Sequence, residues 1–414
     1  MYIANIFYIC NIHVSKMEKL IEYSNKRIAA TDTGYLRFLH EIIDWNNRLI
    51  AITGARGVGK TTFLLQHIKM NLFHRPDEVI FVNADDLHFA KSTLIEFADE
   101  FVKRGGKYLF IDEVHKYKNW STEIKNIYDY FSELNIVITG SSALDIFKSA
   151  ADLSRRTMTY KMPGLSFREF IALSEGIQLS KLALSDILNN HLQISTDIAG
   201  KIKPIKLFRE YLRYGYYPFF KESVESFPIK LKQAVNQVLE SDLPAIVHID
   251  YNSIFSLRKL LSIITEIVPF KPNISKLSQQ VEVSRETLVR YLNHLNNADL
   301  LLLLQSSIKG MSRMNKPEKV YLHNPNLMFA LTEKEVNIGT LRELFFYNQL
   351  QHGHNVLSSN AGDFIVDQKF TFEIGGKNKG AGQIKMVKDS FLAIDDIEIG
   401  TGNKIPLWLF GMLY

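Results

Sequence analysis

The sequence predicts an α/β protein that begins with a parallel sheet covered by helices and continues into helical and α+β parts. Short apolar runs alternate with helical stretches up to about residue 173 of the 414-residue chain. A helix-turn-helix pattern lies in residues 254–310, and strands and helices are mixed in residues 319–414. Strands buried on both faces read as unbroken apolar runs, so the first alternation indicates a parallel sheet.

Five apolar runs of residues 1–173 are expected to be the strands of this sheet. Before them, apolar side chains recur at helical spacing over about the first 45 residues, among them Leu20, Leu36, Leu39 and Ile43. The run at residues 1–14 lacks the basic region and cleavage site of a signal peptide. It reads as a short strand or as an extension ahead of a start at Met17. The five runs span residues 49–53, 79–83, 107–112, 135–140 and 157–162.

The remaining residues are expected to form three further parts. Residues 174–253 read as helices of a lid or linker. In residues 254–310, a helix, a tight turn at Glu282–Ser284 and a second helix capped by Ser284 precede a buried strand, which indicates a winged helix-turn-helix. Residues 319–414 are expected to be α+β, with strands near residues 319–323, 363–367, 370–375 and 406–411.

The composition is that of an ordinary globular protein, with 46% hydrophobic and 22% charged residues. It excludes a disordered, collagen-like or disulfide-stapled chain. The single cysteine, Cys10, rules out an intrachain disulfide and fits a reducing compartment. No run approaches the roughly 18 apolar residues of a membrane span, so we expect a cytoplasmic protein without a membrane partner. The net charge of +5 permits contact with nucleic acid without requiring it.

A phosphate-binding motif follows the first expected strand. The segment matches G-x-x-x-x-G-K-[ST], and a helical pattern comes after it. Its glycines let successive N–H groups point at phosphate oxygens, and the helix presents its positive end to the same anion. We therefore expect ATP to be bound here, with the lysine on the β- and γ-phosphates and the first threonine on Mg²⁺. The residues are Gly54, Ala55, Arg56, Gly57, Val58, Gly59, Lys60 and Thr61, followed by Thr62.

Two adjacent carboxylates end the third expected strand. Asp112 and Glu113 follow four apolar residues, at the strand end where α/β sheets bind ligands. Asp112 is expected to hold Mg²⁺ through water, and Glu113 to polarise the attacking water. An ordinary helix-capping acidic pair is the alternative interpretation.

Further polar groups are candidates for contact with the γ-phosphate. The fourth expected strand ends in Ser141, which we predict to lie between the two motifs, with Thr139 as the alternative. Each of them could instead cap the following helix. Arg155 and Arg156 come next, and either could reach the γ-phosphate as an arginine finger, from its own chain or from a neighbouring subunit. Two solvated surface arginines are the alternative.

In this order, these residues resemble AAA-type ATPases whose C-terminal domain is related to PD-(D/E)XK nucleases. The resemblance runs from NKRI through GARGVGKTT, LFIDEVHK, ITGSSA, LSRRTMTYKMPGLSFREF and EYLRYGYYP to the C-terminal segment. It implies a P-loop NTPase of the ASCE/AAA type at residues 1–173 and a nuclease-like domain at residues 319–414. It also makes Arg156 the matching arginine. The family usually has a second glycine where this chain has Tyr216.

The resemblance further implies an acidic residue on a helix, an aspartate on one strand and Glu-x-Lys on the next. Glu343, Asp363 and Glu373 fall in that order, but the lysine position is Gly375, and Lys377 comes two residues later. Along an ideal strand Lys377 lies about 6.6 Å too far. We therefore expect a nuclease-like fold that binds or assembles without cleaving DNA.

The expected function is a Mg²⁺-dependent ATPase that couples ATP binding and hydrolysis to a change in its C-terminal parts. The alternative is an ATP-regulated DNA-binding protein or nuclease of a mobile-element or defence system. Duplex DNA is a candidate partner, through Arg285 and Arg290 of the helix-turn-helix or through residues 368–388, which carry five lysines and one glutamate. A homo-oligomer or an unidentified protein partner is the other possibility.

Overall fold

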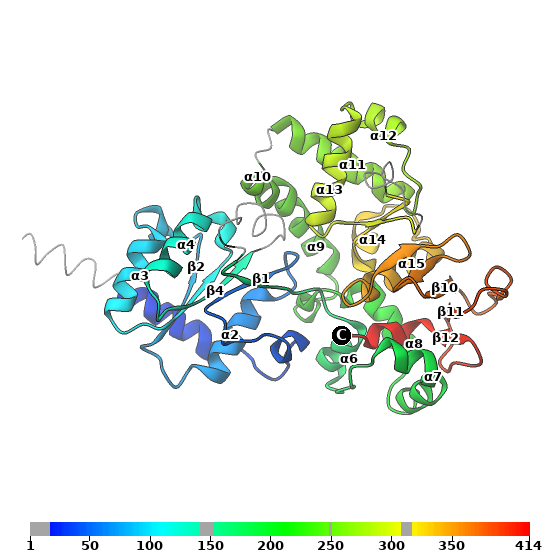
Figure 1. Cartoon of the computed structure of the whole chain (residues 1–414), viewed down its shortest axis with the longest axis horizontal. Helices are drawn as coiled ribbons and strands as arrows, with labels where there is room; N and C mark the ends of the chain where they lie inside the picture. Colours follow the sequence, from blue (N-terminus) through cyan, green and yellow to red (C-terminus); the bar gives the residue numbers. More distant parts are fainter. Residues whose placement is uncertain (1–16, 141–152, 154, 248–250, 308–316) are drawn as a thin grey trace, which may run out of the picture. The chain divides into compact units, whose positions relative to one another are not determined.

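The computed structural model describes residues 17–140, 153, 155–247, 251–307 and 317–414 (Figure 1). The chain forms two compact units that divide between Met162 and Pro163. The first unit is a helix-covered parallel sheet, and the second combines helices with a five-stranded and a two-stranded sheet. No helix among the described residues is long and apolar enough to cross a membrane.

All five strands of the first unit are parallel and have the order β2-β3-β4-β1-β5. The five strands predicted from the apolar runs are therefore confirmed. Residues 17–30 form a helix ahead of them. The strands are β1 (Leu49–Thr53), β2 (Val79–Asn83), β3 (Tyr108–Asp112), β4 (Asn135–Gly140) and β5 (Met158–Lys161). The connecting helices are α2 (Lys60–Asn71), α3 (Leu94–Lys103) and α4 (Trp120–Tyr130), with short turns η1 (Phe38–Glu41), η2 (Leu87–Ala90) and η3 (Val114–Lys116).

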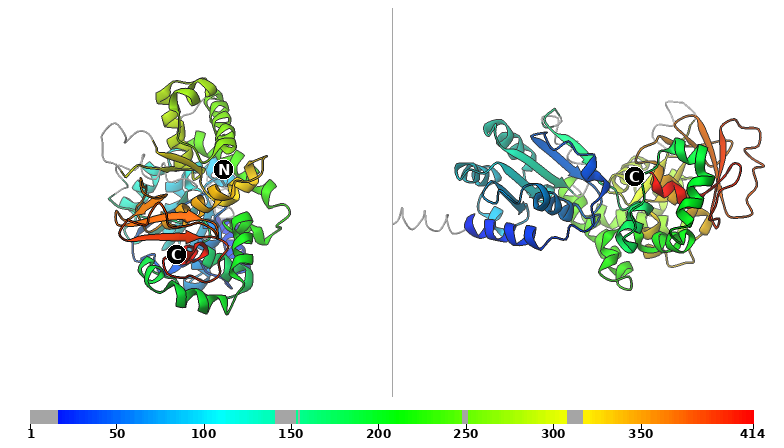
Figure 2. Two further views of the ribbon diagram at one scale, coloured as in Figure 1. Left: turned by 90° about the vertical axis from the view of Figure 1, so that its right-hand side faces the viewer. Right: turned by 90° about the horizontal axis from the view of Figure 1, so that it is seen from below.

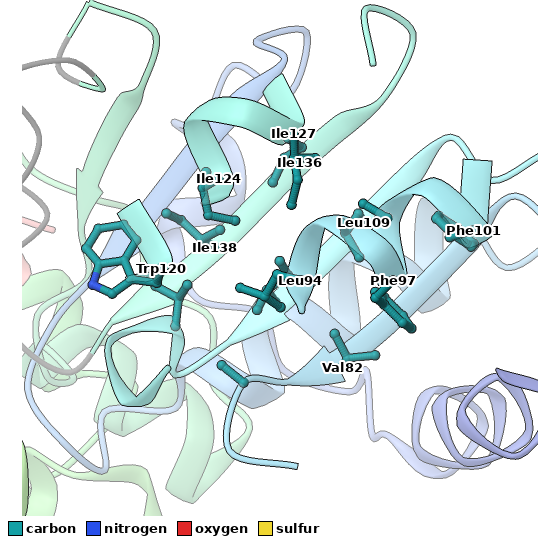
Figure 3. Packing of buried hydrophobic residues seen from close by; sticks show 14 of the residues in the cluster. Val82, Leu94, Phe97, Phe101, Leu109, Trp120, Ile124, Ile127, Ile136 and Ile138 are labelled. Atoms are coloured by element: carbon teal, nitrogen blue, oxygen red, sulfur yellow. The ribbon is translucent and has the colours of Figure 1, made fainter. Parts of the chain in front are cut away.

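Both faces of this sheet are buried along β1, β2, β3 and β4, because alternate residues of these strands contribute to different sides, whereas the edge strand β5 is partly exposed. One set packs against α3 and α4, which lie together on one face (Figure 3). The intervening residues, such as Ile50, Phe81 and Phe110, are equally buried but lie outside that cluster. Each such apolar side chain contributes roughly 1.5–3 kcal/mol when fully buried. The cluster includes Val82, Leu94, Phe97, Phe101, Leu109, Trp120, Ile124, Ile127, Ile136 and Ile138.

The expected helix over the first 45 residues is wrong beyond residue 30, where only the short turn η1 is helical. Tertiary contacts hold the intervening segment against α2. The Gln66 side chain donates to the carbonyl oxygens of Asp32 and Tyr35, at 2.8 Å each. These contacts join residues distant in sequence, so local helical spacing did not reveal them.

The second unit begins with helices and ends in a mixed sheet. Its first helices are α6 (Phe167–Glu175), α7 (Leu184–Ala199), α8 (Pro204–Glu210), α9 (Phe227–Gln237), α10 (Leu243–Ile246) and α11 (Tyr251–Ile267). Two π-helical segments, η4 (Tyr211–Gly215) and η6 (Val238–Asp242), and a 3-10 turn, η5 (Pro218–Lys221), lie among them. Tyr216, where the resemblance leads one to expect glycine, is buried against Gly164. A Cβ at position 164 would lie 2.2 Å from its ring.

The helix, turn, helix and strand predicted in residues 254–310 are present as separate elements. They are α12 (Ile274–Val281), α13 (Arg285–Asn297) and β6 (Leu301–Leu304). Glu282 ends α12 with a left-handed φ of 62°, and the Ser284 hydroxyl accepts a hydrogen bond from the N–H of Thr287 at the start of α13. Strand β6 pairs antiparallel with β7 (Lys319–Leu322), and together they form a two-stranded sheet.

The C-terminal sheet has the order β12-β11-β10-β9-β8. Its strands are β8 (Val356–Ser358), β9 (Phe364–Val366), β10 (Phe370–Gly375), β11 (Ser390–Ile394) and β12 (Lys404–Pro406), preceded by α14 (Pro325–Leu331) and α15 (Ile338–Leu350). Strands β10, β11 and β12 are parallel, and β8 and β9 are antiparallel to their neighbours. From α15, Phe346 packs its ring on Phe364 and Phe372.

The strand expected at residues 406–411 is wrong, because Leu407–Met412 form the 3-10 turn η8. All six residues are buried, so the sequence shows no periodic change between apolar and polar residues that would distinguish a strand from a helix. Figure 2 shows this red C-terminal turn among the green helices that begin the unit. The Ser166 hydroxyl and Arg168 Nε donate to the Tyr414 carbonyl oxygen at 2.6 and 3.0 Å. Helix α6, in which the expected boundary at residue 173 falls, therefore belongs with the second unit.

Candidate nucleotide-binding site

The loop between β1 and α2 has the conformation that its glycines permit. Gly57 and Gly59 have φ values of 86° and 97°, in the left-handed region that side chains disfavour. A Cβ on Gly54 would lie 2.2 Å from the Met162 carbonyl oxygen. Ala55 and Val58 are buried, whereas Thr62 is exposed on the first turn of α2. The loop is thus a turn of fixed shape that leads into a helix N-terminus.

Lys60 reaches back into this loop. Its ammonium group donates to the carbonyl oxygens of Gly54 and Ala55 at 2.9 and 3.0 Å, and the residue is only 4% exposed. Burial of a lysine is tolerated where its hydrogen bonds are satisfied. The predicted phosphate-binding lysine therefore lies with its charge inside the loop.

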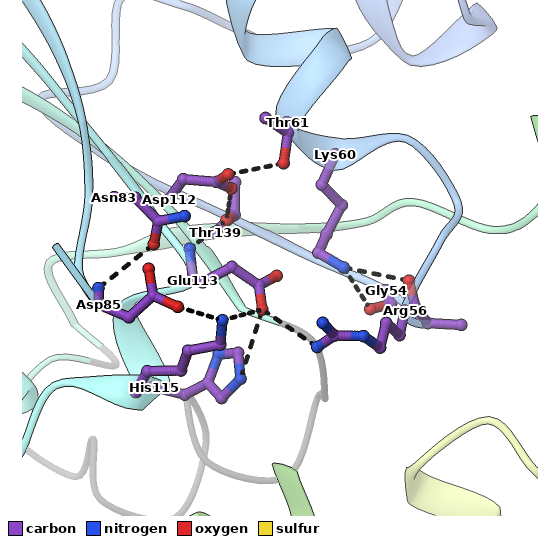
Figure 4. Close-up of polar contacts among 12 residues, drawn as sticks. Gly54, Arg56, Lys60, Thr61, Asn83, Asp85, Asp112, Glu113, His115 and Thr139 are labelled. Atoms are coloured by element: carbon purple, nitrogen blue, oxygen red, sulfur yellow. Dashed lines mark hydrogen bonds and ion pairs between the residues drawn. The ribbon is translucent and has the colours of Figure 1, made fainter. Parts of the chain in front are cut away.

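Two hydroxyl groups hold the buried Asp112 carboxylate. Thr61 Oγ1 donates to one oxygen at 2.6 Å, and Thr139 Oγ1 donates to the other at 2.5 Å (Figure 4). Strand β4 lies between β1 and β3, so the sheet order brings these three residues together. The predicted metal-holding pair, Thr61 and Asp112, is in direct contact. Ser141 lies outside the described residues, and its alternative, Thr139, occupies the position between the motifs.

Glu113 has an unusual backbone and electrostatic setting. Its φ is 54°, and its N–H donates to Thr139 Oγ1 at 2.9 Å. Glu113 Oε2 lies 3.8 Å from each of three basic nitrogens, on Arg56, His115 and Lys116. Among the described residues, no hydrogen-bond donor reaches this buried oxygen. Sequence reasoning missed His115 and Lys116, although both stand within three residues of Glu113.

Arg156, the predicted arginine finger, contacts its own unit. Its Nε and Nη2 pair with the two carboxylate oxygens of Asp129 on α4, at 3.0 and 3.2 Å. Arg155 is exposed. The structure thus places Arg156 in a two-point ion pair, and its role in catalysis stays a prediction.

A pair of histidines packs beside the helix that follows the loop. His67 on α2 stacks on Trp45 with ring centroids 3.4 Å apart, and His40 lies 4.0 Å from the Phe63 ring. Burial lowers the pKa of His67 to about 3 and that of His40 to about 4. Both rings are therefore neutral near pH 7.

The second unit gathers the acidic residues that the resemblance singled out. Glu343 on α15 accepts hydrogen bonds from Tyr321 and Lys319, at 2.5 and 3.0 Å. Asp363, just before β9, accepts from the N–H of Ile374 at 2.8 Å. Burial, followed by the charge of Glu343, raises the pKa of Asp363 to about 6. Among the described residues, no group of three His, Cys, Asp or Glu side chains is arranged to hold a metal ion.

A different lysine from the one considered in the sequence lies beside this cluster. Lys379 Nζ lies 2.5 Å from Glu373, which is only 2% exposed. A Cβ at Gly375 would lie 2.4 Å from the Cβ and Cγ of Lys379, so this side chain covers the glycine. Lys377, the lysine considered from the sequence, is exposed. The turn after β10 brings back a lysine four positions beyond the glycine, and spacing along a strand did not reveal it.

Comparisons with known proteins agree with this site. Residues 46–171 match the profile of the AAA domain family. Most of the first unit and the start of the second therefore match an AAA-type P-loop ATPase domain. Residues 205–337 match a domain of unknown function. An uncharacterized protein of Methanocaldococcus jannaschii is 25% identical over 430 residues, which cover 96% of this chain and 90% of that protein.

Two solved structures are also similar to this chain, although each superposes on it with a low TM-score. AMPPCP-bound DnaA from Aquifex aeolicus is 19% identical and matches 64% of this chain and 92% of its own, with a TM-score of 0.28. PCH-2 of C. elegans is 16% identical and matches 38% of this chain and 44% of its own, with a TM-score of 0.24.

Proposed function

We propose that this protein is a Mg²⁺-dependent ATPase whose AAA domain drives a change in the second unit. One observation carries the proposal: Lys60 lies inside the loop while Thr61, Asp112 and Thr139 form a continuous hydrogen-bonded row beside it. Hydroxyl and carboxylate oxygens are the ligand types that Mg²⁺ prefers. The loop N–H groups and the start of α2 suit a phosphate anion.

Each of these residues has a defined task in the proposed reaction. Lys60 and the loop would bind the β- and γ-phosphates, and Thr61 and Asp112 would hold Mg²⁺. The metal, when bound, would supply neutralisation of the phosphate charge. Glu113 receives the proton of the attacking water or orients that water. Thr139 accepts the Glu113 N–H and donates to Asp112, so it links the two carboxylates.

The test compares ATP turnover of the wild type with that of Glu113→Gln. Glutamine keeps the shape of the side chain but cannot act as a base, so we expect at least about 100-fold slower turnover with ATP binding retained. Glu123→Gln is a suitable control, since Glu123 lies on α4 and bonds Tyr117. Turnover of Glu113→Gln within a few-fold of wild type would assign the base to another residue.

We infer that the second unit receives the change and that α12, α13, β6 and β7 form a winged helix-turn-helix. The support is the order of two helices joined by a tight turn, followed by an antiparallel strand pair. Arg290 is exposed on α13, as a DNA-contacting residue would be. Adding duplex DNA to the turnover assay tests the partner: an increase in turnover that is lost in Arg290→Ala supports DNA, and no change favours a protein partner.

A nuclease is the second candidate function, favoured by the position of Lys379 over Gly375. The same contacts indicate that the carboxylates of this cluster are already occupied, because Glu373 and Glu343 are both paired with lysines. We therefore still expect no Mg²⁺- or Mn²⁺-dependent nicking of supercoiled DNA, with or without ATP. Cleavage that disappears in both Asp363→Ala and Lys379→Ala, but persists in Lys377→Ala, would establish the nuclease.

A further inference from the structure

Lys116 in the AAA domain lies between two carboxylates at unequal distances. Its ammonium nitrogen is 2.5 Å from Asp85 Oδ2 and 3.8 Å from Glu113 Oε2. Lys116 ends η3, which begins directly after Glu113, whereas Asp85 follows β2. A lysine placed in this way has two competing carboxylate partners, and its ammonium group pairs with the nearer one.

The sheet fixes the nearer acceptor in place. Asn83 at the end of β2 is in register with Asp112 at the end of β3, and the Ala84 N–H donates to the Asp112 carbonyl oxygen at 2.9 Å. Asp85 is therefore held beside the strand end that precedes Glu113, and Figure 4 shows the Asp85 and Glu113 side chains near each other. The Asp85–Lys116 pair thus joins β2 to the residues that follow β3.

We propose that Asp85 is a positioning residue for ATP hydrolysis, which holds Lys116 away from Glu113 and leaves the Glu113 carboxylate available to water. The inference rests on the proposed function of Glu113. A buried carboxylate oxygen without a hydrogen bond strongly attracts a nearby ammonium group. Lys116 needs to move only about 1 Å to form a direct hydrogen bond with Glu113.

Arg56 and His115 also face Glu113 Oε2 at 3.8 Å. Arg56 belongs to the phosphate-binding loop, whereas Lys116 pairs more closely with a second carboxylate, that of Asp85. Removing the charge of Asp85 therefore acts on Lys116 and leaves Arg56 and His115 in place. The expected consequence is a direct Lys116–Glu113 pair that must break before Glu113 can polarise water.

Four variants test this arrangement: Asp85→Asn, Lys116→Met, the double variant and Asp85→Glu. We expect Asp85→Asn to lower kcat about two- to fivefold, the range of a charge pair with one exposed partner, with an unchanged KM for ATP. Lys116→Met and the double variant should both turn over ATP close to the wild-type rate, because neither contains the competing ammonium. Asp85→Glu keeps the charge and should stay near wild type.

The control is Asp99→Asn, which breaks the Lys103–Asp99 pair on α3. That pair has the same 2.5 Å separation but joins two solvent-facing side chains of one helix. Its removal should leave kcat and KM unchanged. A loss of activity through misfolding would persist in the double variant and would appear in thermal unfolding, whereas the proposed effect disappears when Lys116 is also removed.

The outcomes separate this inference from the proposed function. If wild-type protein hydrolyses ATP and Glu113→Gln does not, an Asp85→Asn rate within twofold of wild type contradicts the inference alone. A double variant as slow as Asp85→Asn contradicts it as well. Absence of ATP turnover in the wild type contradicts both the function and the role of Asp85.

Discussion

The two units each bury a carboxylate, but they compensate its negative charge differently. In the AAA domain, Asp112 is 1% exposed and accepts hydrogen bonds from the hydroxyls of Thr61 and Thr139. In the second unit, Glu373 is 2% exposed and is paired with Lys379. A carboxylate held by hydroxyl groups keeps its full negative charge, whereas one paired with lysine is neutralised within the chain.

This difference separates a site that is completed by an outside ion from one that is complete without it. Burying a charge without compensation is unfavourable, so Asp112 is stabilised further by a bound cation. Glu373 gains less from a metal ion, because the metal must first displace Lys379. The Gln383 side chain also faces Glu373, and its amide nitrogen reaches both carboxylate oxygens when that nitrogen is turned toward them.

The largest effect is expected for Lys60→Ala. Loss of the ammonium group should weaken ATP binding by at least about 100-fold and abolish turnover, because a charge-assisted contact to phosphate is lost. The free energy of unfolding should change little, as the loop carbonyls become accessible to water. Calorimetric titration with ATP and denaturant unfolding measure the two quantities. Unchanged ATP affinity would remove the basis for the nucleotide site.

Arg156→Ala tests whether the nucleotide site of one AAA domain also receives an arginine from a second copy of the chain. A finger acting between subunits would make turnover rise with protein concentration, and its loss should slow turnover about 100-fold or more. Mixing Arg156→Ala with Lys60→Ala protein should then restore part of the activity, since each supplies what the other lacks.

Arg155→Ala is the matched control for this experiment, because Arg155 is the exposed neighbour. No restoration on mixing, together with turnover independent of concentration, would restrict Arg156 to its own chain. Its pair with Asp129 would then be a stabilising contact of α4.

Lys379→Ala should lower the stability of the second unit, in contrast to Lys60→Ala in the first. Glu373 would remain buried without its cation, at a cost of about 1–3 kcal/mol in the free energy of unfolding, given that Lys379 is partly exposed. Lys377→Ala is the control and should stay within about 0.5 kcal/mol of wild type. Equal stability of the two variants would show that Glu373 does not depend on Lys379.

The smallest effect concerns the acid sensitivity of the AAA domain. Burial holds the folded pKa of His67 at about 3, below the usual value of 6.5. Below pH 6.5 the unfolded chain therefore binds a proton that the folded chain excludes, and stability falls as the pH falls toward 3. The slope from His67 is at most about 1.4 kcal/mol per pH unit. Unfolding of His67→Gln between pH 7 and 5 should show a shallower slope, and an identical slope would contradict a neutral His67.

Local sequence determined the parts of this protein that depend on neighbouring residues. The P-loop from Gly54 to Thr61 and the pair Asp112–Glu113 were found from contiguous motifs, because their chemistry requires those residues at that spacing. The five strands of the first sheet were found from their apolar runs. The turn at Glu282 and the Ser284 cap were likewise local features.

Tertiary structure alone decided the contacts between distant segments. The order β2-β3-β4-β1-β5 brings Thr139 onto Asp112, and the β2 end brings Asp85 to Lys116. The turn after β10 places Lys379, rather than Lys377, beside Glu373. Residues 407–412, apolar throughout, could not be identified as a 3-10 turn until their burial against α6 and α7 was known. In each case the free energy comes from burial and charge pairing across the fold, which a linear pattern does not encode.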